Sequence, residues 1–95
     1  SIAVYHVPDE YGIGLAAGTV ATARARGLEL RERTPVRLLQ ACANDDGRRY
    51  YENLTRELEQ RGRPDAVVLA MRTVEAACFT KALRARWPAI AIIAG

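Results

Sequence analysis

The chain has 95 residues, of which 49% are hydrophobic and 26% charged; this is the composition of one ordinary globular domain and excludes a disordered or fibrous protein. The formal net charge is only +3 and the basic residues are spread along the chain, so nucleic acid is not an expected partner. No stretch reaches the ~20 apolar residues of a membrane span, and no signal peptide is visible. Because the sequence begins and ends on apolar strand residues, we expect it to be a segment of a longer protein.

The first predicted elements are a strand over residues 2–7 and a helix that begins near Tyr11. Apolar, β-branched and aromatic residues make up the strand, and Pro8 ends it because proline has no amide hydrogen for the ladder. Asp9 can accept hydrogen bonds from the free amides of the helix, and Glu10 adds negative charge at its positive end. Glycine costs about 1 kcal/mol inside a helix, so the glycines here imply close packing or close approach of a ligand. They are Gly12, Gly14 and Gly18.

The middle of the chain predicts an edge strand, a loop and a second helix. Gly27 is placed to end the first helix, and the alternation of apolar and polar residues over 28–34 is typical of a half-exposed edge strand. Residues 36–47 have the mixed character of a connecting loop. An apolar stripe predicts the second helix over residues 47–61. The stripe consists of Tyr51, Leu54 and Leu58.

The last third predicts two buried strands around a third helix. Five consecutive apolar residues over 66–70 indicate a strand covered on both faces. The helix starts near Thr73, whose hydroxyl can cap it, and ends before Pro88. Residues 90–94 supply the other apolar strand. The stripe of the third helix consists of Ala76, Phe79 and Leu83.

The order βαβαβαβ specifies parallel pairing through right-handed crossovers. We therefore expect an α/β fold with three layers, α/β/α, around a parallel sheet of about four strands. The polar strand belongs at the edge, which gives the order 2-1-3-4 of a Rossmann-like or flavodoxin-like lobe. In such a sheet the loops that leave strands one and three diverge at their carboxyl ends and form a crevice.

The expected crevice identifies three candidate ligand-binding residues. Tyr11 lies in the loop after the first strand, and we expect it at the mouth of the crevice, partly exposed. Arg72 and Thr73 follow a buried strand and open a helix, so a guanidinium, a hydroxyl and free amides converge there. These groups are suited to bind an anion. The alternative is that Arg72 is simply solvated and that Thr73 only caps the helix.

The phrase Gly12-Ile13-Gly14-Leu15-Ala16-Ala17-Gly18 matches GxGxxxG and raises the possibility of dinucleotide binding. In that fold the first glycine follows the strand almost at once. Here residues 8–11 intervene and place two carboxylates where a pyrophosphate would lie. Close packing of the helix on the sheet explains Gly14 and Gly18 equally well.

Other reactive residues favour structural interpretations. Asp45 and Asp46 are better explained as helix caps than as the acidic pair of a magnesium site, because they lie in a loop before a helix. His6 has no recognisable nucleophile motif beside it and is expected to be a strand side chain. Cys42 and Cys78 are far apart with no CxxC spacing, so we expect free thiols and no metal site.

The first 30 residues resemble the sequences of a known protein family. The phrase Asp9-Glu10-Tyr11-Gly12-Ile13-Gly14-Leu15-Ala16, an alanine-rich helix and then Gly27-Leu28-Glu29-Leu30 are similar to the start of the second lobe of branched-chain amino acid binding proteins of ABC transporters, which have the type 1 periplasmic-binding fold. Their pattern is D-x-x-Y-G-x-G-L, a helix and a GxEV-type strand. Further similarity lies in Tyr51-x-x-Leu54-x-x-x-Leu58, in Pro64-Asp65-Ala66-Val67-Val68 and in Phe79-x-x-x-Leu83-Arg84. It covers nearly the whole chain.

The resemblance implies a function in binding. In that family a small ligand is held between two lobes that close about a hinge, and no bond is made or broken. It implies that residues 1–95 are one lobe of a two-lobe protein, that Tyr11, Arg72 and Thr73 contact an amino acid or related carboxylate, and that no cofactor is needed. The missing first lobe and an ABC transporter permease are the implied partners. The implied location is periplasmic or extracytoplasmic, compatible with a lipoprotein anchor.

Two departures from the family pattern bear on the ligand. The loop over residues 36–46 is longer than usual, and Met71-Arg72 replaces small or aromatic residues. Two alternatives therefore stay open: a nucleotide-binding Rossmann-type enzyme fragment, and a degenerate lobe inside a regulatory protein. We expect no enzymatic activity, because no pair of titratable groups is placed to act as acid and base.

Overall fold

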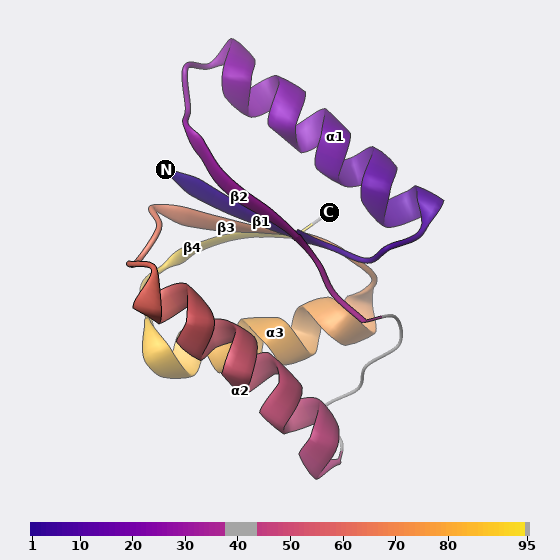
Figure 1. Cartoon of the computed structure of the whole chain (residues 1–95), viewed down its shortest axis with the longest axis vertical. Helices are drawn as coiled ribbons and strands as arrows, with labels where there is room; N and C mark the ends of the chain where they lie inside the picture. Colours follow the sequence, from indigo (N-terminus) through magenta and orange to yellow (C-terminus); the bar gives the residue numbers. More distant parts are fainter. Residues whose placement is uncertain (38–43, 95) are drawn as a thin grey trace.

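The computed structural model describes residues 1–37 and 44–94, and its strands and helices alternate along the chain (Figure 1). The elements are β1 (Ile2–His6), α1 (Glu10–Ala25), β2 (Leu30–Pro35), α2 (Asp45–Gln60), β3 (Ala66–Ala70), α3 (Thr73–Arg86) and β4 (Ala91–Ala94). The strands form one sheet in the order β2-β1-β3-β4, and every pair is parallel. Helix α1 covers one face of the sheet, and α2 and α3 cover the other (Figure 1). The predicted α/β class and the three layers are confirmed.

The larger core lies between the sheet and the two helices α2 and α3. Three aromatic rings stack through it: Tyr5 from β1 lies edge-on to Phe79 of α3, with 4.7 Å between centroids, and Phe79 lies 5.5 Å from Tyr51 of α2. All three side chains are fully buried. Since each ring comes from a different element, this cluster fixes both helices against the sheet.

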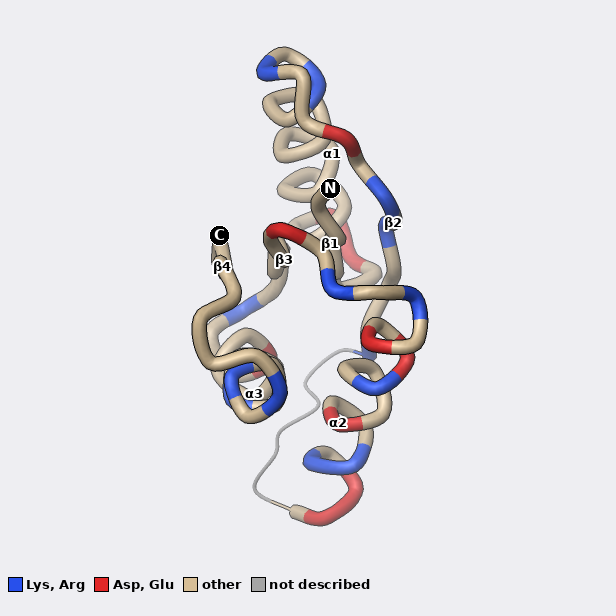
Figure 2. Tube along the Cα trace, turned by 90° about the vertical axis from the view of Figure 1, so that its left-hand side faces the viewer, with Lys and Arg blue, Asp and Glu red and all other residues tan. Residues whose placement is uncertain are grey.

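A smaller core lies between the sheet and α1. It consists mainly of short side chains: Ile2, Val4, Ala16, Ala23, Val68 and Ala70. Along α1 itself charged residues occur only near the two ends, as the tan stretch of this helix shows in Figure 2. The middle of α1 is therefore uncharged, in contrast with the charged outer surface of α2.

The C-terminus of α1 explains why β2 begins later than residue 28. Gly27 adopts a left-handed conformation with φ of 72° and donates its amide to the Arg24 carbonyl, while Leu28 donates to the Ala23 carbonyl at 2.8 Å. These two bonds form a Schellman motif, which confirms Gly27 as the end of the helix. They also hold Leu28 in the turn, so the prediction that the strand starts there is wrong by two residues.

The N-terminus of α2 differs from the prediction in its capping residue. Asn44 is the N-cap, and its side-chain oxygen accepts from the Gly47 amide at 2.8 Å. Asp45 and Asp46 lie in the first turn, where they complement the helix dipole. Part of the predicted connecting loop, residues 38–43, lies outside the described residues.

Strand β4 is not the buried strand that its apolar sequence predicted. It lies at the edge of the sheet, and Ile93 is 55% exposed while Ile92 is half-buried. The reason is that α3 covers only one face of this strand. On the other face, among the described residues, α1 lies mainly over β1, β3 and β2, which leaves β4 largely uncovered.

Candidate functional site

Arg72 and Asp9 meet at the carboxyl edge of the sheet. Asp9 follows β1 and Arg72 follows β3, and these strands are neighbours with Ala70 paired to His6 in parallel register. The two loops therefore leave the sheet side by side. Arg72 Nη1 lies 2.6 Å from Asp9 Oδ2, with the Arg72 side chain 46% and the Asp9 side chain 26% exposed. The ion pair joins the two loops at the position expected for a crevice.

Tyr11 belongs to the same cluster. It lies in the first turn of α1, is 39% exposed, and its ring lies under the Arg72 guanidinium with 5.2 Å from the guanidinium carbon to the ring centroid. This is a cation–π contact. The prediction that Tyr11 is partly exposed at the carboxyl end of the strands is confirmed. Arg72 is thus held on one side by a carboxylate and on another by a ring, both from the loop and helix start after β1.

Asp9 has a second role as the N-cap of α1. Its Oδ1 accepts the Gly12 amide at 2.8 Å, and its carbonyl accepts the Ile13 amide at 2.9 Å. The hydrogen bond from Gly12 and, after it, the hydrogen bond from Arg72 lower the pKa of the Asp9 carboxyl below its ordinary value. Asp9 is therefore an anion whose two oxygens have different partners.

Thr73 lies apart from this cluster. The N-cap of α3 is Arg72, which makes no side-chain capping hydrogen bond, so the prediction that the Thr73 hydroxyl caps this helix is wrong. Thr73 is instead the first residue of the helix. It lines an open hollow of about 480 Å³ beside the end of β4. The other residues of that hollow are Met71, Ala76, Ala77, Thr80 and Ala94.

The glycines of α1 divide into two kinds. A Cβ built on Gly12 would lie 2.2 Å from the Val7 carbonyl oxygen, so only glycine allows the helix to start this close to β1. Nothing lies within 4 Å of a Cβ built on Gly14 or Gly18, and the expectation that these two pack against the sheet is wrong. Both line an open hollow of about 570 Å³ with Leu15, Val68 and Ile93 among its other walls.

His6 is a buried residue of β1. Its side chain is 9% exposed, and Nδ1 lies 3.1 Å from the Val7 carbonyl oxygen. A carbonyl can only accept, so Nδ1 is the protonated nitrogen in this contact. The backbone carbonyl of His6 accepts from Val36, which extends the pairing of β1 with β2.

The cysteine prediction requires a correction. Cys78 of α3 is disulfide-bonded, so the expectation of a free thiol is wrong for this residue, and Cys42 lies outside the described residues. Within residues 1–37 and 44–94 no three His, Cys, Asp or Glu side chains are grouped where they could hold a metal ion.

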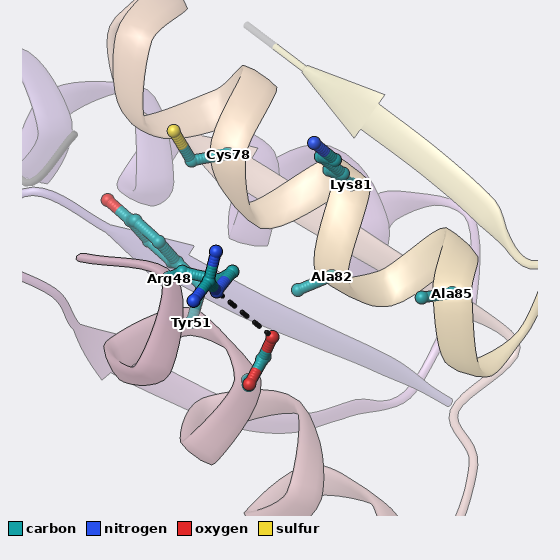
Figure 3. Close-up of a pocket in the computed structure, with 7 residues that line it drawn as sticks. Arg48, Tyr51, Cys78, Lys81, Ala82 and Ala85 are labelled. Atoms are coloured by element: carbon teal, nitrogen blue, oxygen red, sulfur yellow. Dashed lines mark ion pairs between the residues drawn. The ribbon is translucent and has the colours of Figure 1, made fainter. Parts of the chain in front are cut away.

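A small pocket of about 150 Å³ opens between α2 and α3 (Figure 3). Arg48 and Tyr51 line it from α2, and Cys78 and Lys81 line it from α3. Arg48 is paired with Asp45 and, at 4.0 Å, with Glu52 on its own helix. Its charge is therefore compensated within α2, and the pocket offers less room than a typical ligand site.

The sequence predicted Asp9 only as a helix cap, and the structure adds its ion pair with Arg72. The signal for its second role was its position after β1, opposite an arginine at the same point after β3.

None of the helices in the described part of the chain is long and apolar enough to cross a membrane. No model of a known protein family matches the chain, and a search of curated proteins finds no match.

Proposed function

We propose that this chain is a ligand-binding lobe of a two-lobe solute-binding protein, either the substrate-binding component of an ABC transporter or a receptor sensor. The ligand is a small amino-acid-like carboxylate held in a cleft between the lobes. In this proposal the chain contributes the wall formed by the loops after β1 and β3. Arg72 binds the carboxylate, and the Tyr11 ring covers an aliphatic or aromatic part of the ligand.

The observation that carries the proposal is the meeting of Arg72 and Tyr11. They are separated by 61 positions along the chain, yet the guanidinium lies 5.2 Å from the ring centroid and both side chains remain more than a third exposed. An exposed guanidinium can form a bidentate pair with a carboxylate. The position agrees with the rule that α/β sheets bind ligands outside the carboxyl ends of their strands. Thr73, one residue further, borders the neighbouring hollow and is assigned the far side of the same ligand.

The disulfide at Cys78 supports a periplasmic or extracytoplasmic location for the proposed protein. Disulfides persist in oxidising compartments and are rare in the cytosol. A lipid anchor, a first lobe and a transporter permease as partner belong to the same proposal.

The nucleotide-dependent enzyme fragment is less well supported by the same geometry. A pyrophosphate at the start of α1 would need the free amides of the first turn. The Asp9 side chain already accepts the Gly12 amide and places its negative charge there. Binding of nicotinamide or adenine nucleotides at micromolar concentration by the full-length protein would favour that alternative.

A degenerate lobe inside a regulatory protein has one observation in its favour. Arg72 is already paired with Asp9, so the pair could serve only to join the two loops. This alternative predicts a protein that keeps the fold and binds no member of an amino acid panel.

The experiment is calorimetric titration of the full-length protein with L-amino acids and aromatic carboxylic acids. We expect at least one to bind, and we expect Arg72→Ala to weaken that binding by roughly tenfold or more, the loss of a charged hydrogen-bonded pair. Arg63→Ala is the control, because Arg63 is an exposed arginine before β3, at the opposite end of that strand. Equal affinity of Arg72→Ala and the native protein would refute the role of Arg72, and a panel without any ligand would favour the degenerate lobe.

A further inference from the structure

We propose that Asp9 is a built-in competitor for the ligand-binding arginine: a ligand carboxylate reaches Arg72 only against the charge of Asp9, which thereby lowers the affinity of the site for small monocarboxylates. The inference rests on the proposed function and deepens it, because it names the residue that regulates the same site.

The geometry places Asp9 where a ligand carboxylate would lie. Its Oδ2 is 2.6 Å from Arg72 Nη1, the distance of a charge-assisted hydrogen bond. Its Oδ1 is held by the Gly12 amide, so the carboxylate cannot leave the arginine freely without also disturbing the start of α1. Asp9 is therefore held where it competes with a ligand carboxylate for Arg72.

The Tyr11 ring contacts Arg72, the other member of the ion pair. The guanidinium lies 5.2 Å from the ring centroid, so Arg72 is oriented toward the loop after β1. An incoming carboxylate must either displace Oδ2 from Nη1 or use the remaining guanidinium hydrogens with a like charge a few ångströms away. In both cases Asp9 opposes binding.

One substitution separates the charge of Asp9 from its capping role. Asparagine is as good an N-cap as aspartate, so Asp9→Asn can keep the hydrogen bond from the Gly12 amide while it removes the negative charge. Asp65→Asn is the matched control: Asp65 is an exposed carboxylate just before β3, at the end of that strand away from Arg72. It changes the net charge equally and leaves the crevice intact.

The test is calorimetric titration of the full-length protein with 4-methylpentanoate and 3-phenylpropanoate, two monocarboxylates without an amino group. We expect Asp9→Asn to tighten binding of at least one of them roughly three- to tenfold, the effect of removing a like charge at a partly exposed site. Asp65→Asn should leave both affinities unchanged. In an Arg72→Gln background, Asp9→Asn should have a smaller effect, because the direct repulsion between the two carboxylates remains while the competition for Arg72 is gone.

Three results would overturn the inference. They are an unchanged or weakened affinity in Asp9→Asn, an effect of undiminished size in the Arg72→Gln background, and no binding of either acid by the native protein and Asp9→Asn. An unchanged affinity in a protein that still binds amino acids through Arg72 refutes the competition and leaves the proposed function standing. Absence of binding by every amino acid and acid refutes both. Circular dichroism of Asp9→Asn checks that the fold is retained.

Discussion

Arg72, two residues after the end of β3, donates a hydrogen bond from Nη1 to Oδ2 of Asp9, which lies three residues after the end of β1. The pair links the two central strands at the edge where α/β sheets bind their ligands. It also shows that a positive charge placed at such an edge can be matched by a carboxylate from the same chain.

The close approach of α1 to β1 makes a prediction for Gly12. Gly12→Ala should destabilise the protein by about 1–3 kcal/mol or more, because the new Cβ would lie 2.2 Å from the Val7 carbonyl oxygen. Gly14→Ala and Gly18→Ala are the controls, since both positions are open, and each should stabilise by about 0.5–1 kcal/mol. Urea unfolding measures all three. Equal stability of the Gly12 and Gly14 variants would contradict the packing.

The N-cap of α2 makes a second prediction. Asn44→Ala removes the acceptor of the Gly47 amide and should lower the free energy of unfolding by about 1 kcal/mol. Asn44→Asp keeps an acceptor and should leave stability nearly unchanged. Urea unfolding again supplies the measurement, and an Asn44→Ala variant as stable as the native protein would assign the cap to another residue.

The ion pair of Asp9 predicts a dependence of stability on pH. The pKa of Asp9 is lowered in the folded state by the Gly12 amide and by Arg72, so its contribution is fully present above the ordinary aspartate pKa of about 3.9 and is lost as the pH falls below it. Native protein should therefore lose more stability than Asp9→Asn between pH 5 and pH 2. Thermal unfolding over this range checks the prediction, and parallel curves for the two proteins would contradict it.

Much of the fold could be predicted because its signals are local. Gly27 ends α1 through a left-handed conformation, and the polar alternation around Arg31 and Arg33 belongs to β2, which is an edge strand. The meeting of Tyr11 with Arg72 followed from topology, because parallel strands carry their carboxyl ends to one edge.

The other features could not be predicted because they depend on three-dimensional packing, which the sequence pattern does not specify. Asn44, Asp45 and Asp46 are all competent caps, and which one is used depends on where the helix axis points. The pairing of Asp9 with Arg72 depends on rotamers of two long-range partners. The exposure of Ile93 depends on what covers β4, which hydrophobicity cannot report.

The most direct measurement of the central claim observes the Arg72 side chain itself. In the full-length protein labelled with ¹⁵N-arginine, the Nε–Hε resonance of Arg72 is assigned by its loss in Arg72→Lys. On titration with the amino acid or carboxylic acid that binds most tightly in calorimetry, this resonance should shift and saturate with the calorimetric affinity, while that of Arg63 stays in place. An Arg72 resonance that does not move at saturating ligand would contradict the assignment of this crevice as the binding site.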